Sequence, residues 1–191
     1  MLATEFLHGQ GMGNQLFCYV TTRMLAHRLG YDFGIKGLKS AGDSRVNQKG
    51  FYFMDLDYGK EVPDDLERYD EYRHALKTDE WLRTDIRLTD KTLLNIPDNR
   101  IIYGNMQSED YFYDRLDLVK EWLKVREEYD HMDTNEKDLC VLNFRGGDMI
   151  GNPGAYVPRK YWTNAMQRML EYNPNMKFCI VTDDVATAQQ M

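Results

Sequence analysis

Residues 140–148 read Cys-Val-Leu-Asn-Phe-Arg-Gly-Gly-Asp, a short apolar run that breaks into a polar loop. Such a run is typical of a buried strand. Open α/β sheets bind their ligands at junctions of this kind, outside the carboxyl ends of the strands. Arg145 offers a permanently charged planar fork suited to phosphate, and Asp148 is placed to orient that fork. An arginine–aspartate pair that only caps the strand is the alternative interpretation.

The chain beyond this loop predicts a complete βαβ unit. A helix is expected from Pro158 through Tyr172, because proline is favoured in the first turn and an apolar stripe follows. Residues 177–181 then form an apolar strand, with Asp183 just beyond its end. If the two strands are parallel neighbours, Arg145 and Asp183 lie at the same edge of the sheet.

A second pattern of this type opens the chain. A strand predicted over 3–7 runs into a glycine-rich loop and a helix that we expect to end at Leu29, before Gly30. The helix is apolar on more than one side, so we expect it to be buried against a sheet. Gly11 and Gly13 lie at its start, where free N–H groups and the helix dipole suit phosphate or sugar oxygens.

Two further strands are predicted over 31–35 and 100–104. Ser108 is a good N-cap for a helix after the second of them. The apolar stripe of that helix is Phe112, Leu116, Val119 and Leu123. Gln107, directly before the cap, is within reach of a ligand at the end of the strand.

Residues 127–137 contain five acids and no strong apolar pattern, which predicts a linker between two domains. We therefore expect an α/β protein with a Rossmann-like domain over 1–130 and a second one starting at 138. The segment 138–191 is well short of the ~100 residues typical of a domain, so we expect only the first βαβ part of it here.

The composition limits the classes of function. The chain has 191 residues, of which 42% are hydrophobic, enough for a packed core. A net charge of −7 argues against nucleic acid as a partner and means that an anionic ligand needs a local basic site. The three widely spaced cysteines show no metal-ligand spacing, so we interpret them as reduced core thiols of a cytoplasmic protein. Glu5 interrupts the apolar run that a signal peptide requires, and no stretch approaches a membrane-spanning length.

Two features, an Asp-x-Asp pair and the glycine loop, are also compatible with other kinds of nucleotide binding. Asp55 and Asp57 end an aromatic run and form an Asp-x-Asp pair of the kind that holds a divalent ion on a nucleotide-sugar diphosphate, although solvated carboxylates are the commoner meaning of this spacing. The glycine loop also resembles the dinucleotide fingerprint. There the match is poor, because Asn14 stands where the third glycine belongs and Asp32 begins the second strand rather than ending it.

Four segments, in this order, resemble the bacterial α-1,2-fucosyltransferases, glycosyltransferase family 11. Residues 11–17, Gly-Met-Gly-Asn-Gln-Leu-Phe, are similar to the family's Gly-Leu-Gly-Asn-Gln-Met-Phe, and residues 107–112, Gln-Ser-Glu-Asp-Tyr-Phe, to its Gln-Ser-Glu-Lys-Tyr-Phe. Residues 143–148 stand where the family has His-x-Arg-Arg-Gly-Asp. Residues 182–184, Thr-Asp-Asp, follow a strand as the family's Ser-Asp-Asp does.

The resemblance implies a GT-B-like fold of two Rossmann-like domains, the first on the acceptor side and the second binding GDP-fucose. It implies an inverting transfer of fucose to a galactose-type hydroxyl of an oligosaccharide or polysaccharide acceptor. No metal and no cofactor beyond the GDP-fucose donor are expected. We expect a cytoplasmic location with peripheral association at the inner membrane face.

Single residues carry over from the family by their positions. Arg145 corresponds to the first arginine of its motif and is expected to neutralise the departing diphosphate. Asn14 corresponds to the loop asparagine near the fucose and phosphates, and Asp183 is a candidate for reading guanine or ribose. Asn143 replaces the histidine and Gly146 the second arginine, so the roles of those two residues are not carried over. Asn143 is kept as a substrate-binding candidate for its place before Arg145.

A second function of another class stays open. The departures at Asn143 and Gly146, and the family's later donor-binding segment, which has no counterpart here, are compatible with a non-catalytic module that binds a nucleotide sugar or a glycan.

Overall fold

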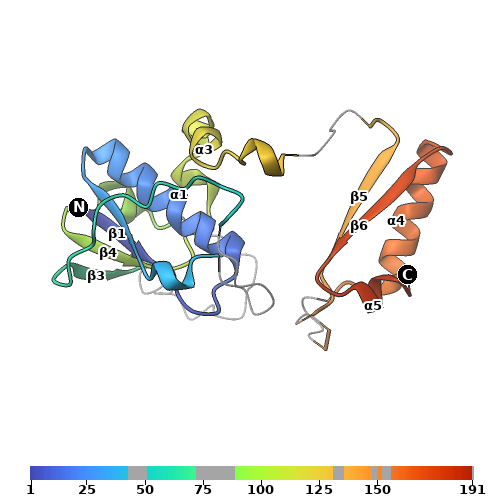
Figure 1. Ribbon diagram of the computed structural model, residues 1–191, viewed down its shortest axis with the longest axis horizontal. Coiled ribbons are helices and arrows are strands. Elements are labelled where there is room, and N and C mark those ends of the chain that lie inside the picture. Colours follow the sequence, from blue (N-terminus) through green and yellow to red (C-terminus); the bar gives the residue numbers. More distant parts are fainter. Residues whose placement is uncertain (43–50, 72–88, 131–135, 148–149, 152–155, 191) are drawn as a thin grey trace. The chain divides into compact units, whose positions relative to one another are not determined.

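A computed structural model of the chain describes residues 1–42, 51–71, 89–130, 136–147, 150–151 and 156–190. The chain forms two compact units, Met1–Asp130 and His131–Met191 (Figure 1). Both combine helices with a sheet, and all the described strands pair in parallel, which is consistent with the predicted Rossmann-like α/β fold. Among the helices that the structure describes, none is long and apolar enough to cross a membrane.

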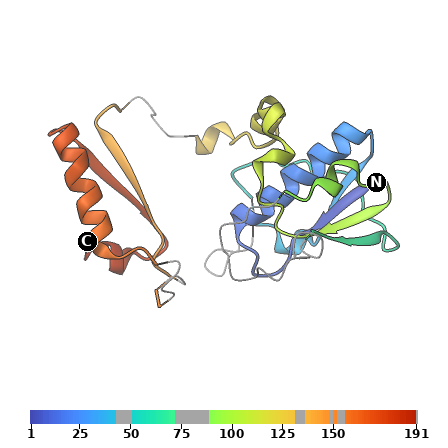
Figure 2. The same ribbon diagram turned by 180° about the vertical axis from the view of Figure 1, so that it is seen from behind.

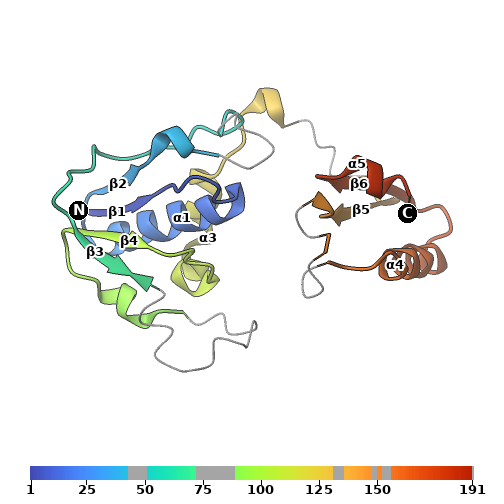
Figure 3. The ribbon, with the colours of Figure 1, turned by 90° about the horizontal axis from the view of Figure 1, so that it is seen from below.

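The sheet of the first unit has the strand order β2-β1-β4-β3 in the described part of the chain (Figure 3). Its strands are β1 (Leu2–Glu5), β2 (Phe33–Lys36), β3 (Glu67–Asp70) and β4 (Arg100–Tyr103). The three strands predicted from apolar runs are confirmed, with ends that differ by no more than two residues. β3 was not predicted, because its sequence, Glu-Arg-Tyr-Asp, lacks an apolar face, and among the described strands it has a neighbour on one side only.

Helix α1 (Met12–Leu29) follows β1 and packs against β1 and β2. It ends at Gly30, whose φ of 70° is in the left-handed region that glycine adopts readily, so the predicted stop is confirmed. The helix is buried on several sides, as its sequence predicts, and even its polar Gln15, Thr21 and Thr22 are inaccessible to solvent. It forms the main core with residues of the central strands, including Leu2 and Ile102.

The long helix predicted after Ser108 is wrong. Two 3-10 turns, η3 (Glu109–Tyr111) and η4 (Tyr113–Arg115), precede a short α3 (Leu116–Trp122). Ser108 caps η3, and its hydroxyl accepts a hydrogen bond from the Asp110 N–H. Phe112 interrupts the helix with φ −148° and ψ 4°, and its ring packs on Phe17, with centroids 6.1 Å apart. A core contact therefore overrides the helical pattern.

The described part of the first unit also contains three more 3-10 turns: η1 (Leu38–Ser40), η2 (Lys91–Asn95) and η5 (Glu127–Tyr129). The last of them lies at the start of the predicted linker, and the boundary between the two compact units follows directly, after Asp130.

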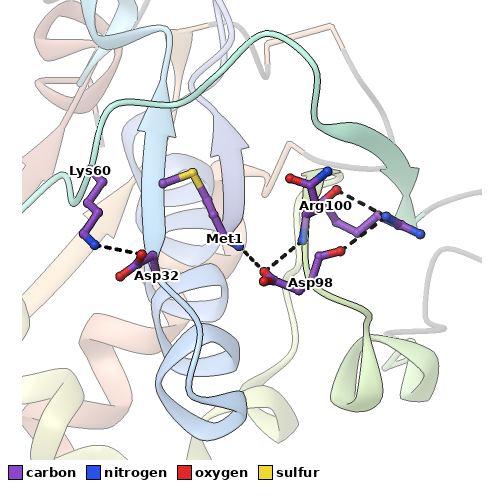
Figure 4. A network of polar contacts seen from close by, with 6 residues as sticks. Met1, Asp32, Lys60, Asp98 and Arg100 are labelled. Carbon is purple, nitrogen blue, oxygen red and sulfur yellow. Dashed lines mark hydrogen bonds and ion pairs between the residues drawn. The ribbon is translucent and has the colours of Figure 1, made fainter.

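Ion pairs join the strands at the amino edge of this sheet (Figure 4). The amino group of Met1 pairs with Asp98, and Lys60 Nζ lies 2.7 Å from Asp32 Oδ2. Arg100, at the start of β4, pairs with Glu67 of β3 at 2.9 Å. At least one partner in each pair is well exposed to water, so these contacts align strand ends rather than form a core.

The second unit has two parallel strands, β5 (Leu139–Phe144) and β6 (Lys177–Thr182), joined through α4 (Arg159–Tyr172) and followed by α5 (Val185–Ala188). Figures 1 and 2 show α4 lying alongside the two strands. The Phe144 ring packs edge-on against Trp162 of α4, with centroids 5.9 Å apart. The predicted βαβ unit with parallel strands is thus confirmed.

The three cysteines are free thiols, but they are not all in the core. Cys18 is buried, whereas Cys140 is half-buried and Cys179 is exposed. Cys179 pairs with Val141 in the sheet, on the face opposite to the buried Leu142 and Phe144. The prediction of three core thiols is therefore wrong for Cys179, because only one face of this two-stranded sheet is covered in the described part of the chain.

Candidate functional site

The first candidate site lies at the carboxyl edge of the four-stranded sheet, where β1 and β4 are neighbours. The chain leaves β1 toward β2 on one side and reaches β4 from β3 on the other, so the strand order reverses between them. Open α/β sheets bind ligands at this position. The loops that follow the two strands, 6–11 and 104–108, carry the polar groups of the site.

Four side-chain amides lie at this edge, three of them on these loops and Asn14 in the first turn of α1. Gln107 Nε2 donates to Asn14 Oδ1 at 2.5 Å, and Gln10 Nε2 donates to Asn105 Oδ1 at 3.4 Å. We call Gln10, Asn14, Asn105 and Gln107 the amide cluster. The sequence analysis selected Asn14 and Gln107 separately, and the structure brings them together across 93 positions.

Gln10 and Asn105 were missed. The available signal was their position, because Gln10 stands between two glycines and Asn105 follows Gly104 at the end of a strand. A polar residue shortly after an apolar strand is in a position where open α/β sheets bind ligands.

Gly11 and Gly13 open the site at the start of α1. Gly11 is the N-cap with φ −59°, which any residue adopts, so its backbone conformation does not require glycine. A Cβ added at Gly11 or Gly13 meets no described atom within 4 Å. The described part of the chain thus leaves open space in front of both, as a site approached by a ligand requires.

Buried groups hold the glycine loop from below. Gln15 donates from Nε2 to the carbonyls of Gln10 (3.1 Å) and Ser40 (2.8 Å) and accepts from the Gly42 N–H (2.7 Å). The Cys18 thiol donates to the Gly104 carbonyl at 3.1 Å. Burial raises the pKa of Cys18 to about 12, so it stays a protonated donor at neutral pH.

The second candidate site lies at the carboxyl ends of β5 and β6, in the other unit. Asp183 Oδ1 accepts from the backbone N–H groups of Gly146 (2.8 Å) and Gly147 (3.3 Å). Arg145 Nε lies 4.0 Å from Asp183 Oδ2. We call Arg145, Gly146, Gly147 and Asp183 the arginine loop. The prediction that Arg145 and Asp183 share one edge of the sheet is confirmed.

The arginine loop differs in detail from what the sequence predicts. Asp183, predicted to read a nucleoside, already accepts two hydrogen bonds from the loop. Asp148, predicted to orient Arg145, lies outside the described residues. Asn143 is exposed on β5, where it pairs with Val181.

Gly146 has no room for a side chain. An added Cβ would lie 2.8 Å from the Phe144 ring and 2.9 Å from Asp184 Cβ. A side chain at position 146 would force these neighbours to shift, so local packing favours glycine there.

Each carboxylate of the Asp-x-Asp pair forms an ion pair with an arginine. Asp55 pairs with Arg126 at 2.5 Å, and Asp57 pairs with Arg23 at 3.1 Å. Within the described residues, no group of three or more histidine, cysteine or acidic side chains is arranged to hold a metal ion.

Searches among protein families, curated proteins and solved structures found no match to this chain. The fold and the two clusters define an α/β protein with a polar site at the carboxyl edge of each of two parallel sheets.

Proposed function

We propose that this protein is a glycosyltransferase that moves fucose from GDP-fucose to a galactose-type hydroxyl of a glycan, with inversion and without a metal. The observation that carries the proposal is how the four segments resembling glycosyltransferase family 11 pair in space. The first two meet through the hydrogen bond between Gln107 and Asn14, and the last two through that from Gly146 to Asp183. Each pair lies at the carboxyl edge of a parallel sheet.

In this proposal the unit His131–Met191 serves the GDP-sugar. The acceptor hydroxyl oxygen forms a bond to C1 of fucose and loses its proton to water, while the bond from C1 to the phosphate oxygen breaks and GDP leaves with that electron pair. Negative charge then develops on the diphosphate. The exposed guanidinium of Arg145 is suited to stabilise it, because its planar fork donates two parallel hydrogen bonds to phosphate oxygens.

The unit Met1–Asp130 serves the sugar hydroxyls, as the acceptor-side domain of a GT-B-like enzyme does. A side-chain amide both donates and accepts hydrogen bonds, and so does a hydroxyl. The amide cluster therefore offers neutral partners of both kinds beside the N-terminus of α1.

Calorimetric titration of GDP, UDP and NAD, each with and without a chelator, tests the nucleotide. We expect GDP to bind equally with and without the chelator, because Arg145 takes the role of a cation. Binding of GDP that requires Mg²⁺ or Mn²⁺ would favour a metal-dependent transferase instead, and binding of NAD alone would exclude the family.

Turnover of GDP-fucose with lactose as acceptor tests the reaction. Release of GDP together with a fucosylated product is the expected result. Binding of GDP without turnover, in the same preparation, would favour the non-catalytic binding module.

A further inference from the structure

Met106 occupies an unusual position between two members of the amide cluster. Its φ is +47°, in the left-handed region that residues other than glycine rarely adopt. The side chain is completely buried, whereas the neighbouring Asn105 and Gln107 contact Gln10 and Asn14. A residue in this conformation persists only where its surroundings hold it.

A buried carboxylate provides that hold. Glu71 Oε2 accepts the backbone N–H of Met106 at 2.8 Å, and Oε1 accepts the hydroxyl of Tyr111 at 3.0 Å. The same hydroxyl accepts the N–H of Asp90 at 2.8 Å. Glu71 is only 7% exposed and Tyr111 is 0% exposed, so both oxygens of the carboxylate are fixed inside the protein.

The turn is also shaped by direct contact with Glu71. A Cβ added at Gly104 would lie 2.3 Å from Glu71 Oε2 and 2.7 Å from Glu71 Cβ. The backbone of Gly104 thus passes directly against this side chain, while Cys18 contacts its carbonyl. Position 104 has no space for a larger residue while Glu71 holds the next turn.

We propose that Glu71 is a positioning residue, which holds the turn 104–107 so that Asn105 and Gln107 present their amides to the ligand. It does not touch the ligand itself. The inference rests on the proposed function only for the identity of that ligand, since the positioning concerns the free protein.

Burying a carboxylate in the core is unfavourable in free energy. Its desolvation is unfavourable, and breaking its contacts leaves a buried donor unpaired. An apolar side chain would fill the space at lower cost but would offer no acceptor for the Met106 N–H. The placement is therefore explained by the geometry of the turn rather than by the stability of the core.

The test uses the full chain with Glu71→Ala, Glu71→Gln and Tyr111→Phe, and exposed Glu61→Ala as the control. Nuclear magnetic resonance without ligand follows hydrogen exchange of the Met106 amide and the side-chain amide signals of Asn105 and Gln107. In Glu71→Ala we expect exchange to accelerate about tenfold or more and both signals to move, because one hydrogen bond of ordinary strength is lost.

Glu71→Gln should restore both readouts largely, because its amide oxygen still accepts the Met106 N–H. Tyr111→Phe should change them in the same direction as Glu71→Ala but less, and it keeps the test decisive if Glu71→Ala does not fold. Unchanged exchange and unchanged amide signals in the folded variants would overturn the proposal.

With lactose and GDP-fucose, Glu71→Ala should raise KM for lactose about tenfold while kcat changes less, and Glu71→Gln should restore it. If the wild-type protein has no such activity, the proposed function fails. The measurements on the free protein still decide the role of Glu71.

Discussion

The two units carry polar sites at the same topological place, yet the chemistry of the two sites differs. At the carboxyl edge of β1 and β4 the groups are neutral amides, paired with one another. At the carboxyl edge of β5 and β6 they are an arginine that is 62% exposed and an aspartate held by backbone N–H groups. Neutral amides suit hydroxyls, and an exposed guanidinium suits phosphate.

The support under the two sites differs as well. The amide cluster rests on buried side chains, among them Gln15, Cys18 and Glu71. The arginine loop follows a two-stranded sheet whose covering helix, α4, has no fully buried residue. The first site is therefore shaped by a packed core, and the second by a few local hydrogen bonds.

Removing the charge of the arginine loop should have the largest effect. Arg145→Ala is expected to lower turnover of GDP-fucose by ~10²–10³, the usual cost of losing a pre-placed electrostatic group. Arg145→Lys should recover little, because the planar fork is lost. Steady-state kinetics with lactose measures both. The control is Arg168→Ala, an exposed arginine on α4; turnover in Arg145→Ala that matches this control would end the assignment.

Removing one amide should have a smaller effect of another kind. Asn14→Ala or Gln107→Ala is expected to raise KM for lactose about fivefold, since a neutral hydrogen bond contributes ~1 kcal/mol. The double variant should lose less than the sum, because the two amides bond to each other. Raising the salt concentration should weaken GDP binding, because salt screens charges, but the differences in KM for lactose between wild type and the amide variants should not change. Asn95→Ala, an exposed amide on η2, is the control; strictly additive losses would contradict a joint role.

The charge state of Glu71 should appear in the pH dependence of stability. Burial raises its pKa above the ordinary 4.5, against the opposing hydrogen bonds from Met106 and Tyr111. The native state then binds a proton on the Glu71 carboxyl group more tightly than the unfolded state does. The contribution of Glu71 to stability is therefore lost as pH rises through the raised pKa. In Glu71→Gln the side chain does not ionise, so this pH-dependent loss of stability is absent.

Urea denaturation from pH 4 to 8 measures the effect. The free energy of unfolding of Glu71→Gln should gain on the wild type as pH rises above about 4.5 and then level off. Glu61→Gln should run parallel to the wild type. A gain that grows as pH falls would mean that the pKa of Glu71 is lowered instead.

A substitution at the amino edge of the first sheet should have the smallest effect on stability and turnover. Lys60→Ala removes an ion pair whose partners are 68% and 54% exposed, and water screens such pairs strongly. Thermal unfolding and turnover are both expected to stay close to wild type. A large loss of turnover would show that the two edges of this sheet are coupled.

Local patterns predicted the elements of the fold well. The apolar runs near residues 3, 33, 101, 140 and 178 are strands, and α1 ends at the glycine that predicted its end. Prediction failed where distant contacts compete with local preference. β3 is charged and has a neighbour on one side only among the described strands, and Phe112 leaves the helical conformation to pack on Phe17.

Local patterns were enough to predict the two βαβ units and to select single polar residues beside strand ends, because strand periodicity, helix stops and turn chemistry depend on neighbouring residues. The contact between Gln107 and Asn14, the hydrogen bond from Gly146 to Asp183 and the burial of Glu71 beside Met106 are visible only in the tertiary structure. These pairings depend on strand order and on packing between segments 35 to 93 positions apart. No local pattern records strand order, so Asn14 and Gln107 were selected singly and Gln10 and Asn105 were missed. The shared edge of Arg145 and Asp183 was predicted because β5 and β6 belong to one βαβ unit.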